Sequence, residues 1–156
     1  MLAAVLLALL AAPPDFSGRW TAETAPVPTT GDVRGDMGSG WTPVITIEQT
    51  ADRLTIEHAL YTRYDVEPPV RFSYALDGSE TRNTIMVGRG LEVQSSRAVW
   101  VGESLKITTV FTNPDAGSGI PPTTEVVHTL TLESPTSLVV EVSRGGSNTR
   151  TVYKKG

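Results

Sequence analysis

The chain has 156 residues, contains no cysteine, and carries a formal net charge of −4 with 39% hydrophobic residues. The absence of cysteine excludes disulfides, thiolate nucleophiles and cysteine metal sites. The scattered basic residues favour neither nucleic acid nor an anionic membrane surface as a partner. The length fits one domain whose stability comes from a hydrophobic core.

The first twelve residues, MLAAVLLALLAA, form an uninterrupted apolar run that Pro13 and Pro14 end. As a helix this run would reach about 18 Å, which is too short for a hydrocarbon core of about 30 Å. We therefore predict a signal peptide over residues 1–12, cleaved close to Ala12. The mature domain, residues 13–156, is expected in the periplasm or outside the cell. Its sequence has no second hydrophobic span, so we expect no membrane span in it.

The mature sequence has the composition of strands rather than helices. Thr is abundant where Val and Ile also occur, and β-branched residues that alternate with polar ones are typical of strands. We predict ten strands, over residues 16–22, 42–49, 53–61, 70–77, 82–87, 91–101, 104–113, 123–133, 137–143 and 148–154.

Most connections between these strands are short and carry turn residues, such as DGSE at 77–80 and GGS at 145–147. Strands joined by tight turns are antiparallel neighbours, and a meander of them leaves two open edges unless it closes. The expected fold class is therefore all-β, a single antiparallel up-and-down β-barrel or clam of about eight to ten strands. Two longer loops, 21–41 and 113–123, interrupt the meander.

The apolar phase of each predicted strand identifies its inward face. His58 shares a phase with Leu54 and Ile56, and His128 shares one with Val126 and Leu130, so both histidines are predicted to point inward. The same pattern predicts aromatic walls inside the barrel, and the residues concerned are Phe72, Tyr74, Trp100 and Phe111.

The sixth predicted strand, residues 91–101, is irregular. Leu91 and Val93 lie on one phase, whereas Ala98 and Trp100 lie on the other. A β-bulge near Ser95 and Ser96 would bring both apolar pairs inside and direct Arg97 to solvent. We therefore expect a bulge there.

Residues 16–20 read FSGRW, so Gly18 and Trp20 form a G-x-W element in the first predicted strand. This element resembles the first strand of calycin barrels, the lipocalin superfamily. The resemblance implies that Trp20 plugs the closed end of the barrel and stacks on an Arg of the last strand, for which Arg150 is the candidate. The chain departs from lipocalins in lacking their disulfide and the signal of their C-terminal helix.

Longer segments, such as ITIEQTADRLTIEH and TLTLESPTSLVVEVSRGG, are similar to a group of largely uncharacterised exported bacterial β-rich proteins of lipocalin-like appearance. This resemblance implies export and a β-barrel. It brings no activity, ligand or site residue with it.

The sequence shows no catalytic signature: it has no G-x-S-x-G, S-x-x-K or H-E-x-x-H motif and no phosphate-binding loop. We therefore expect no enzyme and no cofactor. The two inward histidines admit three interpretations, namely core residues with hydrogen-bond partners, polar anchors for a ligand in an apolar cavity, or ligands of a metal or haem. Two histidines without cysteines make a poor metal site, so no metal is expected.

The function hypothesis from the sequence is non-catalytic binding of a small, largely apolar ligand inside an exported barrel. His58 and His128 would anchor this ligand, and the predicted aromatic walls would surround it. The alternative is an envelope protein-interaction or structural module with a packed core, whose working parts are the loops 21–41 and 113–123.

Overall fold

The computed structural model describes the chain over residues 11–24, 41–59, 70–87, 90–112 and 123–156. Most of the predicted signal peptide, 1–12, lies outside the described residues, as do most of the two predicted loops, 21–41 and 113–123. Within the described ranges, no helix is long and apolar enough to cross a membrane.

The described residues form an all-β fold of ten antiparallel strands in a nearly closed barrel, which confirms the predicted fold class. The strands are β1 (Gly18–Ala22), β2 (Val44–Gln49), β3 (Arg53–His58), β4 (Val70–Ala75), β5 (Glu80–Val87), β6 (Gly90–Val101), β7 (Ser104–Thr112), β8 (Thr123–Ser134), β9 (Ser137–Arg144) and β10 (Ser147–Lys155).

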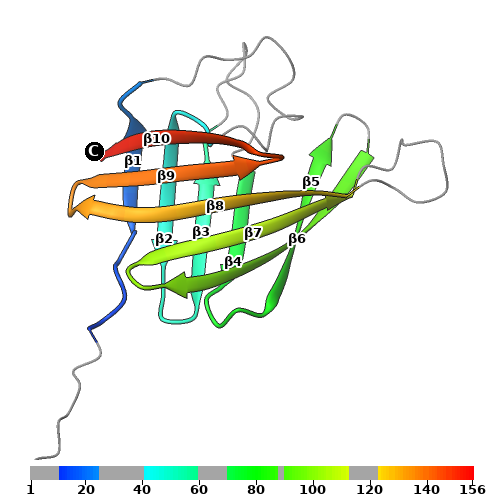
Figure 1. Cartoon of the computed structure of the whole chain (residues 1–156), viewed down its shortest axis with the longest axis horizontal. Helices are drawn as coiled ribbons and strands as arrows, with labels where there is room; N and C mark the ends of the chain where they lie inside the picture. Colours follow the sequence, from blue (N-terminus) through cyan, green and yellow to red (C-terminus); the bar gives the residue numbers. More distant parts are fainter. Residues whose placement is uncertain (1–10, 25–40, 60–69, 88–89, 113–122) are drawn as a thin grey trace, which may run out of the picture.

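The strand order is β4-β3-β2-β1-β10-β9-β8-β7-β6-β5, so the first and last strands of the chain are neighbours in the middle of the sheet. Trp20 of β1 pairs with Lys155 of β10, and Trp20 also pairs with Ile45 of β2. Figure 1 shows the result: β1 to β4 run behind β6 to β10 and cross them steeply, so the sheet folds over on itself. The inward faces of its two halves enclose the core.

The two edges of the sheet, β4 and β5, meet without a backbone ladder, and side chains join them instead. The Asn83 amide accepts a hydrogen bond from the Ser73 N–H (2.8 Å) and donates one to the Ser73 carbonyl (3.0 Å). The Ala75 N–H donates to the Thr81 hydroxyl (2.9 Å). These bonds satisfy backbone groups of an edge that would otherwise lack partners.

The segment before β1 packs against the core of the barrel. The Trp20 indole N–H donates to the Phe16 carbonyl (2.9 Å), and the Phe16 ring stacks on Trp100 with centroids 5.8 Å apart. The Gln49 side chain holds this segment, because it accepts from the Phe16 N–H (3.0 Å) and donates to the Pro14 carbonyl (2.8 Å). Trp20 and Phe16 are both fully buried.

The cation beside Trp20 is Lys155 and not Arg150, which corrects the prediction. The Lys155 ammonium lies 5.3 Å from the centre of the Trp20 ring, whereas Arg150 is exposed and bonds to Glu133 (2.6 Å). The β1–β10 register explains this, because it places Lys155 opposite Trp20. Gly18 has φ +141°, and a Cβ there would lie 2.5 Å from Lys155 Cε, so glycine leaves the room that the lysine chain occupies.

The predicted bulge in β6 is absent, and the predicted phase of its first half was wrong. The pairing of β6 with β5 and β7 runs without a break past Ser95 and Ser96. Gln94 and Ser96 are therefore buried on the inward face, while Val93 is 50% exposed. A register irregularity occurs instead in the β8–β9 pair, between Leu132 and Ser134.

We predict that Asn83→Ala lowers the free energy of unfolding by about 2 kcal/mol, because two backbone groups of Ser73 lose their partners. Urea denaturation measures this change. Asn148→Ala is the matched control, because Asn148 is exposed on β10, and it is expected to cost less than about 0.5 kcal/mol. If both variants lower the free energy of unfolding by equal, small amounts, the contact between β4 and β5 does not depend on the Asn83 amide.

Candidate functional site

The predicted site residues do not form one group. His58 and His128 point inward and are buried, each 6% exposed. Phe72 and Tyr74 of β4 are buried too, and Phe72 contacts His58. Trp100 and Phe111 are only partly buried against the core. Trp100 stacks on Phe16 and not on any of the other predicted site residues. The ligand roles of these residues remain predictions.

Trp41 joins the two histidines across the interior. Its indole ring stacks on His128 with centroids 5.4 Å apart and an interplanar angle of 17°. His58 meets the same indole edge-on at 5.9 Å and meets Phe72 edge-on at 5.3 Å. We call His58, Trp41, His128 and Phe72 the ring cluster. It brings together side chains from β3, β4 and β8 with Trp41, which lies three residues before the start of β2.

Sequence reasoning missed Trp41 because it placed this residue in a loop. Trp41 is nevertheless 7% exposed, and its backbone is held in place by the Tyr153 hydroxyl, which lies 3.2 Å from the Trp41 carbonyl and 3.1 Å from that of Thr42. A large aromatic residue directly before a strand was the available signal. Such a residue can pack over the strand ends while its backbone is still irregular.

The hydrogen bonds around His58 indicate its tautomer. The Thr42 hydroxyl donates its single proton to the Val44 carbonyl (2.8 Å) and lies 3.4 Å from His58 Nδ1. The contact with His58 therefore requires Nδ1–H to donate to the hydroxyl oxygen. His58 Nε2 is then a bare acceptor in the neutral ring.

Burial keeps both imidazoles neutral. Desolvation lowers the pKa of His58 to about 3, with a further contribution from the proximity of His128. Desolvation also lowers the pKa of His128 to about 4. At any pH above about 5, the ring cluster therefore presents two uncharged rings that can donate or accept hydrogen bonds.

Two buried side-chain nitrogens of the interior, His128 Nε2 and Gln94 Nε2, have no hydrogen-bond partner among the described residues. The polar side chains around Gln94 do have partners. Ser96 and Thr109 share a hydrogen bond of 2.8 Å, and the Asn83 amide of β5 bonds to the Ser73 backbone of β4. Gln94 is 2% exposed and was missed by the sequence analysis, because apolar Val93 next to it suggested the opposite phase. Unpartnered buried groups are rare in packed cores, and each requires an explanation.

The inner face offers no cation within the part of the chain that the structure describes. Every Arg and Lys in these ranges is exposed, and several make ion pairs on the outer surface, such as Arg71 with Glu57 (2.7 Å). Nor does any group of three or more His, Asp and Glu side chains in the described ranges lie close enough to hold a metal ion.

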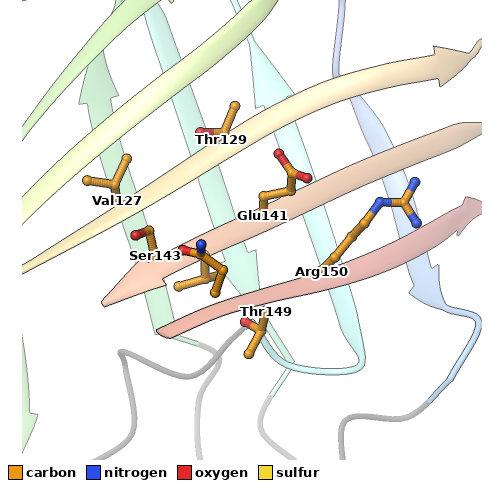
Figure 2. A pocket seen from close by; sticks show the side chains of 8 residues that line it. Val127, Thr129, Glu141, Ser143, Thr149 and Arg150 are labelled. Carbon is orange, nitrogen blue, oxygen red and sulfur yellow. The ribbon is translucent and has the colours of Figure 1, made fainter. Parts of the chain in front are cut away.

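A cavity of about 270 Å³ lies on the outer face of β8, β9 and β10, apart from the ring cluster (Figure 2). Thr129, Glu141 and Arg150 pair across these three strands and share its surface. The full lining is Val127, Thr129, Glu141, Val142, Ser143, Asn148, Thr149 and Arg150. Its polar lining consists of three hydroxyl groups, the Asn148 amide, the Glu141 carboxylate and the Arg150 guanidinium, which bonds to Glu133. A second cavity of about 220 Å³ lies over the outer surface of β6 and β7.

No protein-family model matches the sequence, and a search of curated proteins finds no match either. Solved structures with a similar fold do exist. A fatty acid transporter, REP1-NXSQ, aligns with TM-score 0.57 and 14% identity over 90% of this chain and 95% of its own. A single-residue mutant of the fluorescent protein UnaG aligns with TM-score 0.59 and 19% identity, over 90% of this chain and 96% of its own.

Secretory abundant heat soluble protein 4 from Ramazzottius varieornatus is similar at TM-score 0.59 and 14% identity, over 90% of this chain and 94% of its own. At these identities the likeness shows the fold, and it agrees with the barrel topology described above.

We predict that stability falls as the pH is lowered from 6.5 to 5. The folded pKa values of about 3 and about 4 lie below the usual 6.5, so in this range only the unfolded chain takes up protons on its histidines. The free energy of unfolding should be constant above about pH 7 and should then drop by about 2 kcal/mol per histidine by pH 5. Urea denaturation at several pH values measures this dependence.

The chain has only two histidines, so their removal provides the control. His128→Phe keeps a ring against Trp41 and should remove about half of the pH dependence, and His58→Phe with His128→Phe should remove nearly all of it. A wild-type stability that is flat from pH 7 to 5 would contradict the burial of neutral imidazoles.

Proposed function

We propose that this barrel binds a small, largely apolar molecule in its interior, next to the ring cluster, and acts as a carrier rather than a catalyst. The observation that carries the proposal is the pair of buried nitrogens without partners among the described residues, His128 Nε2 and Gln94 Nε2. A core that served stability alone would favour apolar side chains at these two positions, because an unpaired buried polar group costs about 1–3 kcal/mol. A bound molecule can supply the missing partners.

The composition of the interior supports the same proposal. Ligand sites for small apolar molecules combine aromatic and aliphatic walls with a few polar groups that fix orientation. The ring cluster and Tyr74 supply such walls, and the neutral imidazoles supply polar atoms without a charge to desolvate. One protein of similar fold is named as a fatty acid transporter, which is consistent with a carrier role for this fold.

Native mass spectrometry of the protein purified from cells tests this proposal. We expect an excess of a few hundred daltons over the denatured mass, or its appearance after incubation with a lipid extract. His128→Phe should lower the occupied fraction, because it removes a polar anchor. Arg150→Ala, on the outer cavity of Figure 2, should leave it unchanged. Identical native and denatured masses in every preparation would indicate a filled barrel.

We also propose that the protein is exported with removal of residues 1–12. In support, Pro14 and Phe16 are the first residues whose described hydrogen bonds tie the chain to the barrel, through Gln49. Residues 11–13 are exposed, so cleavage close to Ala12 would leave the hydrogen bonds to Gln49 intact.

Expression of the whole chain in a bacterial host tests export. We expect the periplasmic fraction to contain a protein whose mass corresponds to a start close to residue 13. Replacing Leu6 and Leu7 by Arg, which interrupts the apolar run, should retain the full-length chain in the cytoplasm. A full-length, cytoplasmic wild-type protein would contradict the export proposal.

A further inference from the structure

We infer that the interior ligand is uncharged and presents an oxygen acceptor, such as that of an alcohol, ester or ketone, to the side-chain amide of Gln94. This inference rests on the proposed function and narrows it, because it excludes a fatty acid in its carboxylate form. Gln94 Nε2 carries two N–H donors, is shielded from water, and has no partner among the described residues. An amide nitrogen can only donate, so its partner must be an acceptor.

The position of Gln94 aims this donor into the barrel. Gln94 lies on the inward face of β6, on the same phase as buried Ser96 and Ala98, and it pairs with Asn83 of β5. The Asn83 amide is held by the Ser73 backbone on its oxygen and on its nitrogen, and Gln94 Nε2 makes no hydrogen bond to it. Ser96 is likewise engaged with Thr109. The amide nitrogen of Gln94 therefore lies on the inward face of β6 and bonds to neither of these polar neighbours.

The charge of the ligand follows from what surrounds it. A carboxylate inside a barrel needs a cation or several N–H donors, since burial of an unpaired charge is far more costly than burial of a neutral polar group. The described Arg and Lys side chains are all exposed, and the two imidazoles of the ring cluster are neutral. A neutral oxygen needs only one donor, and Gln94 supplies it.

Displacement of the neutral dye Nile red by four ligands with the same chain length tests the inference. The ligands are dodecanol, methyl dodecanoate, dodecane and dodecanoate, measured at pH 8, where the acid is ionised. We expect dodecanol and the ester to bind at least about tenfold more tightly than dodecanoate, because only the carboxylate leaves a buried charge unpaired. Dodecane should bind more weakly than dodecanol.

Gln94→Met is the matched variant, because methionine has nearly the same length and shape but no amide. This variant should bind dodecanol up to about tenfold more weakly, because one neutral hydrogen bond is lost, and its affinity for dodecane should be unchanged. Ser95→Ala is the control, because Ser95 is the next residue and lies on the opposite face of β6. It should alter neither the affinity for dodecanol nor the affinity for dodecane. The urea midpoint of Gln94→Met should equal or exceed that of the wild type, which shows that the variant is folded.

The possible results separate the two proposals. If dodecanoate binds as tightly as dodecanol, the neutral-ligand inference fails while interior binding of apolar molecules stands. If Gln94→Met binds dodecanol as the wild type does, Gln94 is not the donor and the inference also fails. If neither Nile red nor any of the four ligands binds, the proposed function itself is wrong.

Discussion

The structure depends on one constraint, which is that a meander of antiparallel strands must satisfy its edges. The chain meets this constraint in two ways. The β1–β10 ladder joins the first and last strands of the chain, with Trp20 opposite Lys155. The remaining edges, β4 and β5, are joined by Asn83 and Thr81 side chains instead of a ladder. Once the sheet has closed in this way, alternate residues along most of its strands are buried in one hydrophobic core.

That closed interior determines the chemistry available inside it. Desolvation acts on every inward titratable group, and it lowers the pKa of His58 and His128 well below neutrality. The Arg and Lys side chains of the described residues are all exposed to solvent. Among the described residues the inward face is therefore polar at a few points but carries no charged side chain, a combination that suits hydrogen bonding to neutral molecules better than ion pairing.

Much of the fold could be predicted from the sequence, because turn residues and alternating β-branched residues mark each strand. The inward phases of His58 and His128 followed from neighbours such as Ile56 and Leu130. The phase of β6 was not predictable in this way, because its outward valines mimic a buried face and its inward positions include Gln94. Trp41 and Lys155 could not be placed either, since their positions depend on the β1–β10 register and on contacts between distant segments.

Two residues that sequence reasoning missed, Trp41 and Gln94, belong to the proposed site. A pattern of alternation identifies a buried polar residue as an outward one, because burial of an amide without a partner lowers stability. A position that breaks the pattern, such as Gln94, is therefore either a local cost of folding or a place where another molecule contributes the partner. The neighbouring polar groups argue for the second explanation. Asn83, Ser96 and Thr109 are all paired within the chain, so this wall of the barrel can satisfy its own polar groups, and yet the amide nitrogen of Gln94 finds no partner among the described residues.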